Sequence, residues 1–406
     1  MRSRIERFNA GRDPELLAVK YEKMRKSPFS FFRGTAHLFW EDLAEQSGAV
    51  PDAPFVWACG DLHLENFGSF QGDDALSHFD LNDFDEGALA RATWELSRFV
   101  AGIFVAAPLL DLTPAQAESL AAKFLDAYQR AIHAGKAGSV EQGTADGMVK
   151  TLLHQAGSRN RALLVDSYTT SKKGKLRLDI DSHHMVPVTD RQREDVARWL
   201  GDFAKSQPNP AFFEILDVAR RVAGLGSLGL DRFAILVRGD RDGSPAILDA
   251  KQAAPSSLSK FTKQRQPDWP CESDRIVSIE RRMQAATPAL TNSVKLGRGG
   301  YVLRELQPSE DRLSLKDAKA HPQLLGGMIE TMGKLTAWAQ LRSSGRDGSA
   351  TLGDLTPFAA TDTWRRPLVE YGRAYSGRVE ADYKEFLTTT FAESFHKRLA
   401  GPPGHP

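Results

Sequence analysis

The chain has 406 residues, which is long for a single domain and predicts two or three structural parts. A hydrophobic fraction of 41% and a charged fraction of 26% are typical of an ordinary soluble globular protein. The 53 basic and 52 acidic residues nearly cancel, so charge gives no reason to expect nucleic acid or a membrane surface as a partner. The only two cysteines, Cys59 and Cys271, exclude a disulfide framework and fit a reducing compartment.

The sequence contains no segment that predicts secretion or a membrane span. The N-terminus, MRSRIERFNAGRDPELL, lacks the apolar core of a secretory signal. The longest apolar run, 99–110, includes Gly102 and Pro108 and falls short of the roughly 20 apolar residues that a span needs. We therefore expect a buried helix here and a cytoplasmic protein.

The first half of the chain predicts mostly helices, with a short β-rich segment between them. Residues 54–58 are typical of a strand that runs into a Gly-Asp turn, and residues 67–70 and 76–81 predict a hairpin. The helices expected from apolar spacing are 13–46, with a break at Ser27-Pro28, 91–135 and 143–157.

The second half predicts strands in its centre and helices at its end. Turn residues separate short runs of apolar and β-branched residues there. The expected strands are 175–181, 184–188, 214–223, 230–238 and, beyond the tight turn 239–243, 246–250. The expected helices are 189–206, 271–286, 321–342 and 365–396. The whole chain therefore predicts an α+β fold.

Four polar residues follow the first strand and the hairpin. Asp61 and Asn66 lie five positions apart in a turn, and Asp80 and Asp83 stand at the end of the second hairpin strand. Carboxylates crowded on a partly buried strand repel one another, and a cation relieves that repulsion. Magnesium prefers carboxylates, an amide oxygen, waters and phosphates, so Asn66 with Asp80 or Asp83 predicts a magnesium site. Asp61 is then free to accept a proton from an attacking hydroxyl group.

Other interpretations of this segment compete with the metal site. Turn chemistry alone accounts for Asp73 and Asp74, and the roles of Asp85 and Glu86 stay open. His63 fits a packing and hydrogen-bonding role better than that of a metal ligand. A Gly-Asp-x-His string also occurs in metallophosphoesterases, but these need downstream strings such as Gly-Asn-His, which this sequence lacks.

A glycine-rich segment joins the predicted strands 214–223 and 230–238. A dinucleotide-binding fold needs a helix directly after such glycines, whereas the residues 233–237 predict a strand. Strand, glycine turn and strand form the lid that protein kinases fold over the ATP phosphates. Glycine lets backbone amides approach the phosphate oxygens without a side-chain clash. The residues expected to bind the nucleotide here are Gly224, Gly226, Ser227 and Gly229.

Lys251 and Glu280 complete the predicted nucleotide site. Lys251 ends the third strand of this region, where kinases carry the lysine that grips the α- and β-phosphates. A helix glutamate commonly holds that lysine, and Glu280 in the helix 271–286 is the best candidate. A solvated surface position is the competing interpretation for both residues.

Taken together, these strings resemble an uncharacterised bacterial family, domain of unknown function 2252, which is grouped with the protein-kinase-like superfamily. The resemblance covers residues from about 20 to 345. Three positions depart from the family pattern, since Glu95, Gln252 and Gln340 stand where Asp, Glu and His are usual. The matching strings are Ser27–Gly34, Gly60–Gly68, Phe79–Glu86, Trp94–Arg98, Val222–Gly229 and Lys251. For the first string no mechanism follows, and its Arg33 either reaches a phosphate or the acidic cluster, or caps a buried helix end.

The resemblance implies a two-lobed, protein-kinase-like fold whose parts come in an unusual order. In most kinases the glycine lid and the lysine precede the catalytic loop, whereas here Asp61 and Asp80 come well before Gly224 and Lys251. A circular permutation explains this order, because domain termini often lie close together. The expected parts are a helical lobe with the catalytic and metal loops (1–190), a small antiparallel β-rich nucleotide-gripping lobe (191–310) and the C-terminal part of the larger helical lobe (311–406).

The sequence thus predicts an ATP- and Mg²⁺-dependent phosphotransferase, with Asp61 as the base and Asn66 with Asp80 or Asp83 on the metal. Spacing from Asn66 favours Asp80, whereas the string Asp83-Phe84 resembles the Asp-Phe of kinases. Two alternatives keep the fold, namely transfer of AMP to a protein and a non-catalytic ATP-binding regulator. The acceptor, whether a small molecule or a protein, does not follow from the sequence, nor does the oligomeric state.

Overall fold

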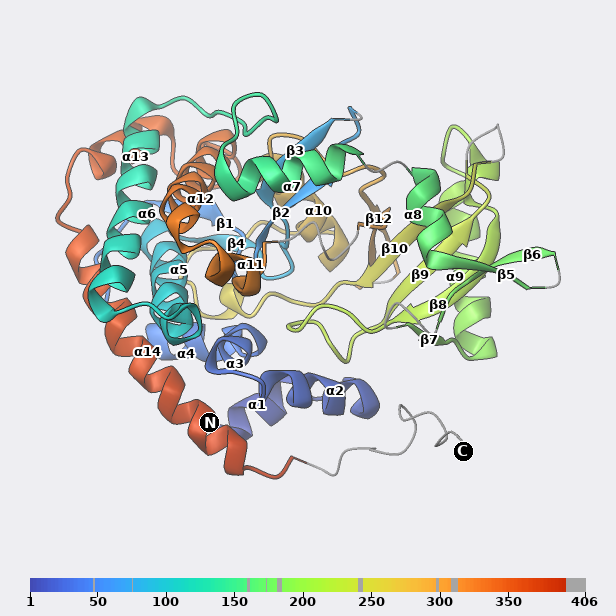
Figure 1. Cartoon of the computed structure of the whole chain (residues 1–406), viewed down its shortest axis with the longest axis horizontal. Coiled ribbons are helices and arrows are strands. Elements are labelled where there is room, and N and C mark those ends of the chain that lie inside the picture. Colours follow the sequence, from blue (N-terminus) through green and yellow to red (C-terminus); the bar gives the residue numbers. More distant parts are fainter. Residues whose placement is uncertain are drawn as a thin grey trace.

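The structure, a computed structural model, consists of a helical part and a β-rich part that lie side by side (Figure 1). It describes residues 1–46, 48–74, 76–158, 161–172, 174–180, 185–239, 244–296, 299–307 and 313–391. Helices and antiparallel strands are largely segregated, so the predicted α+β class is confirmed. Some expected features lie outside the described residues, namely the turn residues 240–243, the strand ends 181 and 184, and the helix end 392–396.

The helical part is built around α5 (Ala92–Ala106), in which every residue except Trp94 is buried. A helix that is buried on all sides needs neighbours on all sides. α6 (Pro114–Ala134) and α14 (Arg365–Thr388) pack against α5, and α12 (Pro322–Arg342) packs against α6. The other helices of this part are α1 (Arg2–Phe8), α2 (Pro14–Met24), α3 (Pro28–Gly34), α4 (Ala36–Glu45), α7 (Gly147–Ser158), α10 (Glu272–Met283), α11 (Leu315–Ala320) and α13 (Leu352–Ala359).

The helical stretch expected over 91–135 is two helices, not one. A short 3-10 turn, η1 (Ala107–Leu110), follows α5 and contains Pro108. Asp111 then takes a left-handed backbone conformation with φ of 53°. Pro114 occupies the first turn of α6, where Thr113 and Gln116 form a capping box. The two prolines and the cap therefore turn the chain back, so that α6 packs on α5.

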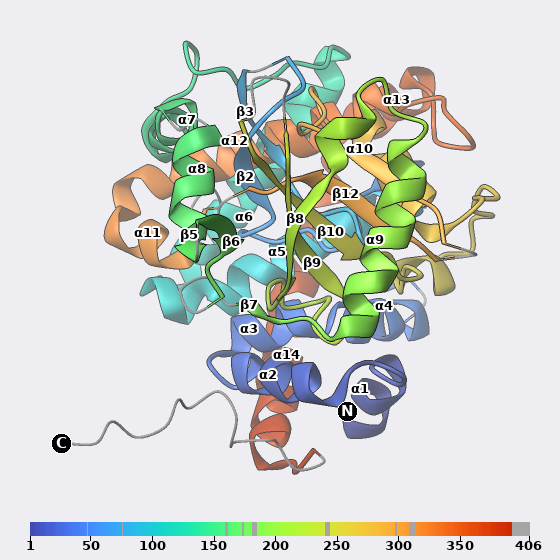
Figure 2. The same ribbon diagram turned by 90° about the vertical axis from the view of Figure 1, so that its right-hand side faces the viewer.

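The β-rich part is a six-stranded antiparallel sheet with the strand order β11-β12-β10-β9-β8-β7. One face packs against α9 (Asp190–Ala204), which lies in front of the sheet in Figure 2. The other face packs partly against α8 (Arg161–Tyr168). The strands are β7 (Met185–Pro187), β8 (Ile215–Arg221), β9 (Arg232–Val237), β10 (Ala246–Gln252), β11 (Asn292–Val294) and β12 (Tyr301–Glu305), with a separate hairpin of β5 (Thr169–Lys172) and β6 (Lys175–Leu178).

The packing divides the chain differently from the expected boundary at residue 190. Val165 and Tyr168 already belong to the core of the sheet, together with Leu236. Conversely, Ile276 and Ile279 of α10 belong to the core of the helical part. The strands expected at 214–223, 230–238 and 246–250 are confirmed as β8, β9 and β10.

Two short strand pairs lie in the helical part, next to the sheet. β1 (Phe55–Ala58) pairs with β4 (Ala88–Arg91), and β2 (Phe67–Gln71) pairs with β3 (Ser77–Leu81), which confirms the expected hairpin. In the register of the hairpin Gly68 lies opposite Asp80. The loops 59–66 and 82–87, which carry most of the predicted catalytic and metal residues, therefore leave neighbouring strands.

One helical stretch among the described residues, 92–110, is long and apolar enough to cross a membrane by length and composition, and 83% of it is buried inside the protein. The core helix of a globular protein meets the same criteria, so this is weak evidence for a span. The observed burial agrees with the buried helix expected for the run 99–110.

Candidate functional site

The turn after β1 is held by a close approach to the loop after β3. Gly60 has φ of 84°, and a Cβ atom at this position would lie 1.9 Å from the backbone oxygen of Glu86. Only glycine fits such a contact in this backbone conformation. The buried carboxylate of Glu95 accepts hydrogen bonds from the backbone amides of Cys59 (2.6 Å) and Gly60 (3.3 Å). Asp61 is thereby fixed beside the loop 82–87.

Asp61 forms an ion pair with a fully buried arginine. Arg98 of α5 donates to Oδ1 of Asp61 from Nη2 at 2.9 Å and from Nε at 3.1 Å. Burial raises the pKa of Asp61, and the charge of Arg98 opposes this. The second oxygen, Oδ2, lies 4.0 Å from Nε2 of His63. One carboxylate oxygen is therefore occupied, while the other faces a histidine.

Asn66 has one satisfied and one unsatisfied polar atom. Its amide nitrogen donates to the backbone oxygens of Asp61 (3.1 Å) and Asp83 (3.2 Å), which ties the two loops together. These bonds fix which end of the amide is oxygen. That oxygen, Oδ1, is buried and has no hydrogen-bond partner among the described residues. A buried acceptor without a donor is costly, so Oδ1 is suited to a cation or a ligand donor.

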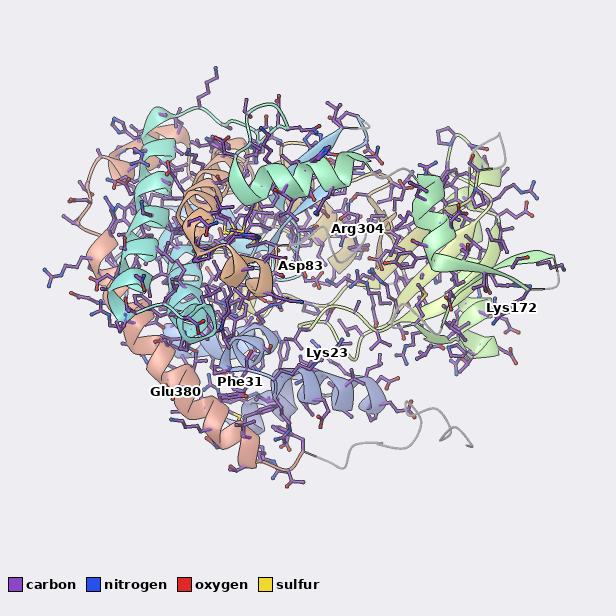
Figure 3. The ribbon with its side chains drawn as sticks, in the orientation of Figure 1. Lys23, Phe31, Asp83, Lys172, Arg304 and Glu380 are labelled. Carbon is purple, nitrogen blue, oxygen red and sulfur yellow. The ribbon has the colours of Figure 1, made fainter. Side chains whose placement is uncertain are left out.

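Lys251 of β10 meets the acidic loop after β3. Its Nζ lies 3.2 Å from Oδ1 of Asp83 and forms an ion pair with Asp85. Burial and the charge of Asp83 raise the pKa of Asp85, whereas Lys251 lowers it. Asp83 lies between the helical part and the sheet in Figure 3. The sequence left Asp85 open, and the structure places it in the same cluster as Asp83.

Glu280 lies in α10 and is buried, but its charged partner is Arg304 of β12. Nη1 of Arg304 is 3.8 Å from Oε1 of Glu280, an oxygen that accepts no hydrogen bond within the part of the chain that the structure describes. Burial raises the pKa of Glu280 to about 7, with Arg304 opposing. The expected ion pair between Glu280 and Lys251 is replaced in the described residues by the pairs of Lys251 with Asp83 and Asp85.

Asp80 points into the helical part, away from Lys251. Its Oδ1 accepts from the amide of Leu81 at 2.9 Å, and its Oδ2 accepts from the amide of Ala285 at 3.0 Å and from Arg342 at 3.2 Å. Only 1% of the residue is exposed. Burial raises the pKa of Asp80, and Arg342 opposes this. Both oxygens thus have protein donors, which is the arrangement of a structural carboxylate.

A cavity of about 70 Å³ brings the two predicted constellations together. Asp61, Asp83 and Asp85 form one wall, and the glycine-rich loop between β8 and β9 forms another. Of that loop, Gly224, Gly226 and Ser227 line the cavity. Gly229 lies at the end of the loop, where a Cβ would be 2.7 Å from Cβ of Arg12. The other lining residues are Phe8, Arg12, Arg33, Gly34, Ala36, His63, Glu86, Leu225, Leu230, Ala254 and Pro255.

The string Ser27–Gly34 forms α3 and provides part of that wall. Ser27 caps the helix by accepting from the amide of Ser30 at 3.0 Å. Arg33 pairs with Glu65, and its Nε lies 3.2 Å from Nε2 of His63. The side chain is thus held at the cavity, which favours the first of its two sequence interpretations over the capping of a helix end.

The sheet surface that continues from Lys251 is charged and buried. Asp249, two residues before Lys251, forms a bidentate ion pair with Arg232 and lies 3.3 Å from Arg221. Burial alone would raise the pKa of Asp249, but the charges of Arg232 and Arg221 outweigh it and hold that pKa well below its usual range. The sequence did not indicate this cluster of Asp249, Arg232 and Arg221, because alternate charged residues in β-strands are usually exposed.

Oxygen ligands for a cation are present, although not as a complete cage. In the part of the chain that the structure describes, no three His, Cys, Asp or Glu side chains form a group that would hold a metal. Asp83 and Asp85 offer carboxylates, and Asn66 offers its unpaired amide oxygen. Magnesium commonly takes one or two protein carboxylates and completes its shell with waters and phosphates. These residues therefore fit a magnesium–phosphate ligand.

Comparison with family models identifies the protein family of this chain. The family model of an uncharacterised protein conserved in bacteria, DUF2252, matches residues 12–389. The chain belongs to the DUF2252 family. No curated protein and no solved structure matches it.

Glu95, Gln252 and Gln340, at which this DUF2252 chain differs from the usual family strings, each form hydrogen bonds in the structure. Gln340 of α12 donates to Oε2 of Glu95 at 3.0 Å and accepts from the hydroxyl of Tyr128 at 2.5 Å. Gln340 and Glu95 together therefore hold the turn that carries Asp61. Gln252 accepts from the amide of Asp231 at 2.9 Å, which closes the base of the glycine-rich loop.

Proposed function

We propose that this protein is an ATP- and Mg²⁺-dependent phosphotransferase with a circularly permuted, kinase-like fold. The observation that carries the proposal is the meeting of Lys251 with Asp83 and Asp85, beside a cavity shared by Asp61 and the glycine-rich loop. These parts come from segments far apart in the sequence. A lysine, metal-binding carboxylates, a glycine lid and an aspartate for the acceptor are the recurring parts of protein kinases.

The order of elements in the sheet supports the kinase-like fold. The chain contains, in this order, β8, the glycine-rich loop, β9, β10 with Lys251 near its end, and α10 with its buried Glu280. Protein kinases use a glycine-rich loop, a lysine on the third strand and a helix glutamate in the same order.

The contacts after α12 support the permutation. The backbone oxygen of Arg346 accepts from Nε1 of Trp57 at 3.0 Å, and the amide of Ala350 donates to the oxygen of Phe55 at 2.7 Å. The chain that leaves α12 therefore runs beside β1, the strand that leads to Asp61. A kinase-like order would join these neighbours directly, and a permutation moves only the point where the chain is cut.

Separate residues of the site would bind the metal, the phosphates and the acceptor. Asn66 Oδ1, Asp83 and Asp85 would hold magnesium, and Lys251 and the loop amides would hold the triphosphate. Bound Mg²⁺–ATP supplies a transferable phosphoryl group whose developing charge the cation neutralises. Oδ2 of Asp61 would accept the hydrogen bond of an acceptor hydroxyl and orient it. The ion pair with Arg98 opposes the effect of burial and favours the charged form of Asp61.

The size of the cavity requires the glycine-rich loop to move. A volume of about 70 Å³ is well below the roughly 300–1,000 Å³ of pockets that enclose a whole small-molecule ligand. The loop would lift to admit the nucleotide and close over its phosphates. Glycine-rich lids are well suited to this motion, because the glycine backbone can adopt more conformations than that of other residues.

Two labelled forms of ATP test the proposal. The wild-type protein is incubated with Mg²⁺ and ATP labelled at the γ- or the α-phosphate, with and without a bacterial metabolite and protein extract. Transfer of the γ-label supports a phosphotransferase, and transfer of the α-label supports AMP transfer instead. Magnesium-dependent binding without transfer supports a regulator. Absence of any Mg²⁺–ATP binding by calorimetry would sink all three.

Substitutions separate binding from transfer in the same assay. Asp61→Asn keeps the size of the side chain and is expected to retain Mg²⁺–ATP binding while losing transfer by at least about 100-fold. Lys251→Met is expected to lose binding itself. Equal transfer by wild type and Asp61→Asn would contradict the role given to Asp61.

A further inference from the structure

The first two helices cover the glycine-rich loop. The guanidinium of Arg12 donates from Nη1 to the backbone oxygens of Gly226 (2.8 Å) and Leu228 (3.2 Å). Next to it, the amide of Asp13 donates to the oxygen of Gly229 at 3.0 Å. Figure 1 shows α1 and α2 beneath the junction of the two parts. The loop that is expected to close over phosphate is thus attached to the N-terminal segment by its own carbonyls.

A buried lysine strengthens the same attachment. Lys20 of α2 is fully buried, and its Nζ donates to the oxygen of Gly226 at 3.1 Å and to Oδ1 of Asn9 at 3.0 Å. Burial lowers the pKa of Lys20 well below its usual value, and the neighbouring charge of Arg12 lowers it further. Arg12 and Lys20 both lie over the ring of Phe8, at 4.8 and 5.4 Å from its centre. The N-terminal segment therefore carries a wall that is anchored to the loop, and Arg12 supplies its positive charge.

This wall faces the cavity. Phe8 and Arg12 line it, together with Asp61 and Asp83. In the described ranges Arg12 forms no ion pair with a carboxylate, and its hydrogen-bond acceptors are neutral carbonyls. The guanidinium keeps its remaining donors for a ligand. Arginine is the residue that suits the forked recognition of phosphate oxygens.

We propose that residues 2–24 are a lid of the phosphate cavity carried by the same chain, and that Arg12 binds a phosphate group of the nucleotide from that lid. The ligand class is a nucleoside di- or triphosphate, so the phosphate-binding role rests on the proposed function. Because Arg12 holds the carbonyls of Gly226 and Leu228, the loop and the N-terminal segment open and close together. Arg12 then contributes twice, by positioning the loop and by contacting the phosphate.

Two substitutions separate these contributions. Arg12→Gln keeps a side-chain donor for the loop carbonyls but removes the charge, and Arg12→Ala removes both. Arg366→Ala is the matched control, because Arg366 lies in α14, outside the lid, with an 88% exposed side chain that pairs with Glu370 at 2.8 Å. Calorimetry with Mg²⁺ and ATP, ADP or adenosine measures binding. Amide hydrogen exchange of residues 222–231 measures loop protection.

The lid predicts a graded result. Arg12→Gln and Arg12→Ala weaken ATP binding by on the order of 10- to 100-fold and leave adenosine binding unchanged. Only Arg12→Ala also speeds amide exchange in residues 222–231, and Arg366→Ala changes neither ATP binding nor exchange. ATP slows exchange in both residues 2–24 and 222–231 of the wild type.

Failure of the lid is distinguishable from failure of the proposed function. If the wild type binds ATP and both Arg12 variants bind it equally well, the phosphate contact is overturned while the phosphotransferase stands. If loop exchange in Arg12→Ala equals that of the wild type, the coupled lid is overturned, and this reading needs no nucleotide. If the wild type binds no ATP, the phosphate role of Arg12 is overturned together with the proposed function.

Discussion

The ammonium group of Lys251 lies 3.2 Å from a carboxylate oxygen of Asp83, although 168 residues separate the two in the chain. This contact joins the third strand of the sheet to a loop of the helical part. The lysine side chain is 11% exposed, and Asp83 is 40% exposed. The pair thus lies at the edge of the cavity, where a ligand can compete for both groups.

Lys251→Met is expected to weaken Mg²⁺–ATP binding at least tenfold, because the phosphates lose their principal lysine. Folding should change little, since two partly exposed carboxylates lose one partner. Calorimetry and the ATP-induced shift in Tm measure ATP binding, and the Tm without ATP measures the stability of the fold. Lys172→Met is the control, because Lys172 lies in the exposed β5–β6 hairpin at the far end of the molecule (Figure 3). Equal losses in both variants would contradict the assignment.

Asp80 and Asp83 should give opposite phenotypes. Asp80→Asn breaks a buried pair with Arg342, so we expect roughly 3–5 kcal/mol lower unfolding free energy and nearly unchanged Mg²⁺ dependence of ATP binding. Asp83→Asn should barely change stability but should lose the Mg²⁺ dependence. Urea unfolding and calorimetry with and without Mg²⁺ measure these. The converse pattern would make Asp80 the principal metal ligand.

Gly60→Ala should destabilise the protein far more than another glycine of similar backbone geometry. The new Cβ would lie 1.9 Å from the Glu86 oxygen, so the turn carrying Asp61 must move. We expect a loss on the order of 4 kcal/mol or more, from a clash combined with backbone strain. Gly48→Ala, at φ of 82° with no atom within 4 Å of its Cβ, should lose about 1 kcal/mol from strain alone. Similar urea midpoints for the two variants would refute the close contact.

Glu280 should make the ligand-free protein less stable as the pH rises. Its pKa is raised from 4.5 to about 7 in the folded state, so folding favours the protonated form. Stability from this group is fully present below pH 4.5 and falls through the pH range up to about 7, by about 3 kcal/mol in total. Glu280→Gln removes that slope. Urea unfolding at pH 5 and pH 8 should therefore show Glu280→Gln gaining on the wild type at the higher pH, and parallel curves would contradict the shift.

The sequence predicted the fold best where local patterns decide it. The turn residues and apolar alternation of 67–81 predicted the hairpin, and the glycine-rich segment between two apolar runs predicted β8 and β9. The sequence did not predict β11, because Asn292–Val294 is too short to show a strand pattern. The sequence predicted α5 and α6 as one helical stretch, because only Pro108 and Pro114 mark the break between them.

The site was predictable where residues follow one another and not where they meet through space. Asp61, Asp83, Gly224 and Gly226 line one cavity, and Lys251 pairs with Asp83 beside it. Asp80 lies three residues before Asp83 in the sequence, but its side chain pairs with Arg342 of α12, which spacing does not reveal. Arg98 lies in a family string, although nothing there names Asp61 as its partner. Arg12 offered no signal, because a single arginine before a helix is usually exposed.

The neighbourhood of α5 and α6 with α12 and α14 has a consequence for how the protein is made. The first pair is translated long before the second, and the whole β-rich part emerges between them. A nascent chain that ends after Glu305 therefore leaves the apolar flanks of α5 and α6 uncovered while its sheet is already complete. We therefore expect the helical half to complete its packing only after the final hundred or so residues are synthesised, and the uncovered flanks of α5 and α6 to bind chaperones until then.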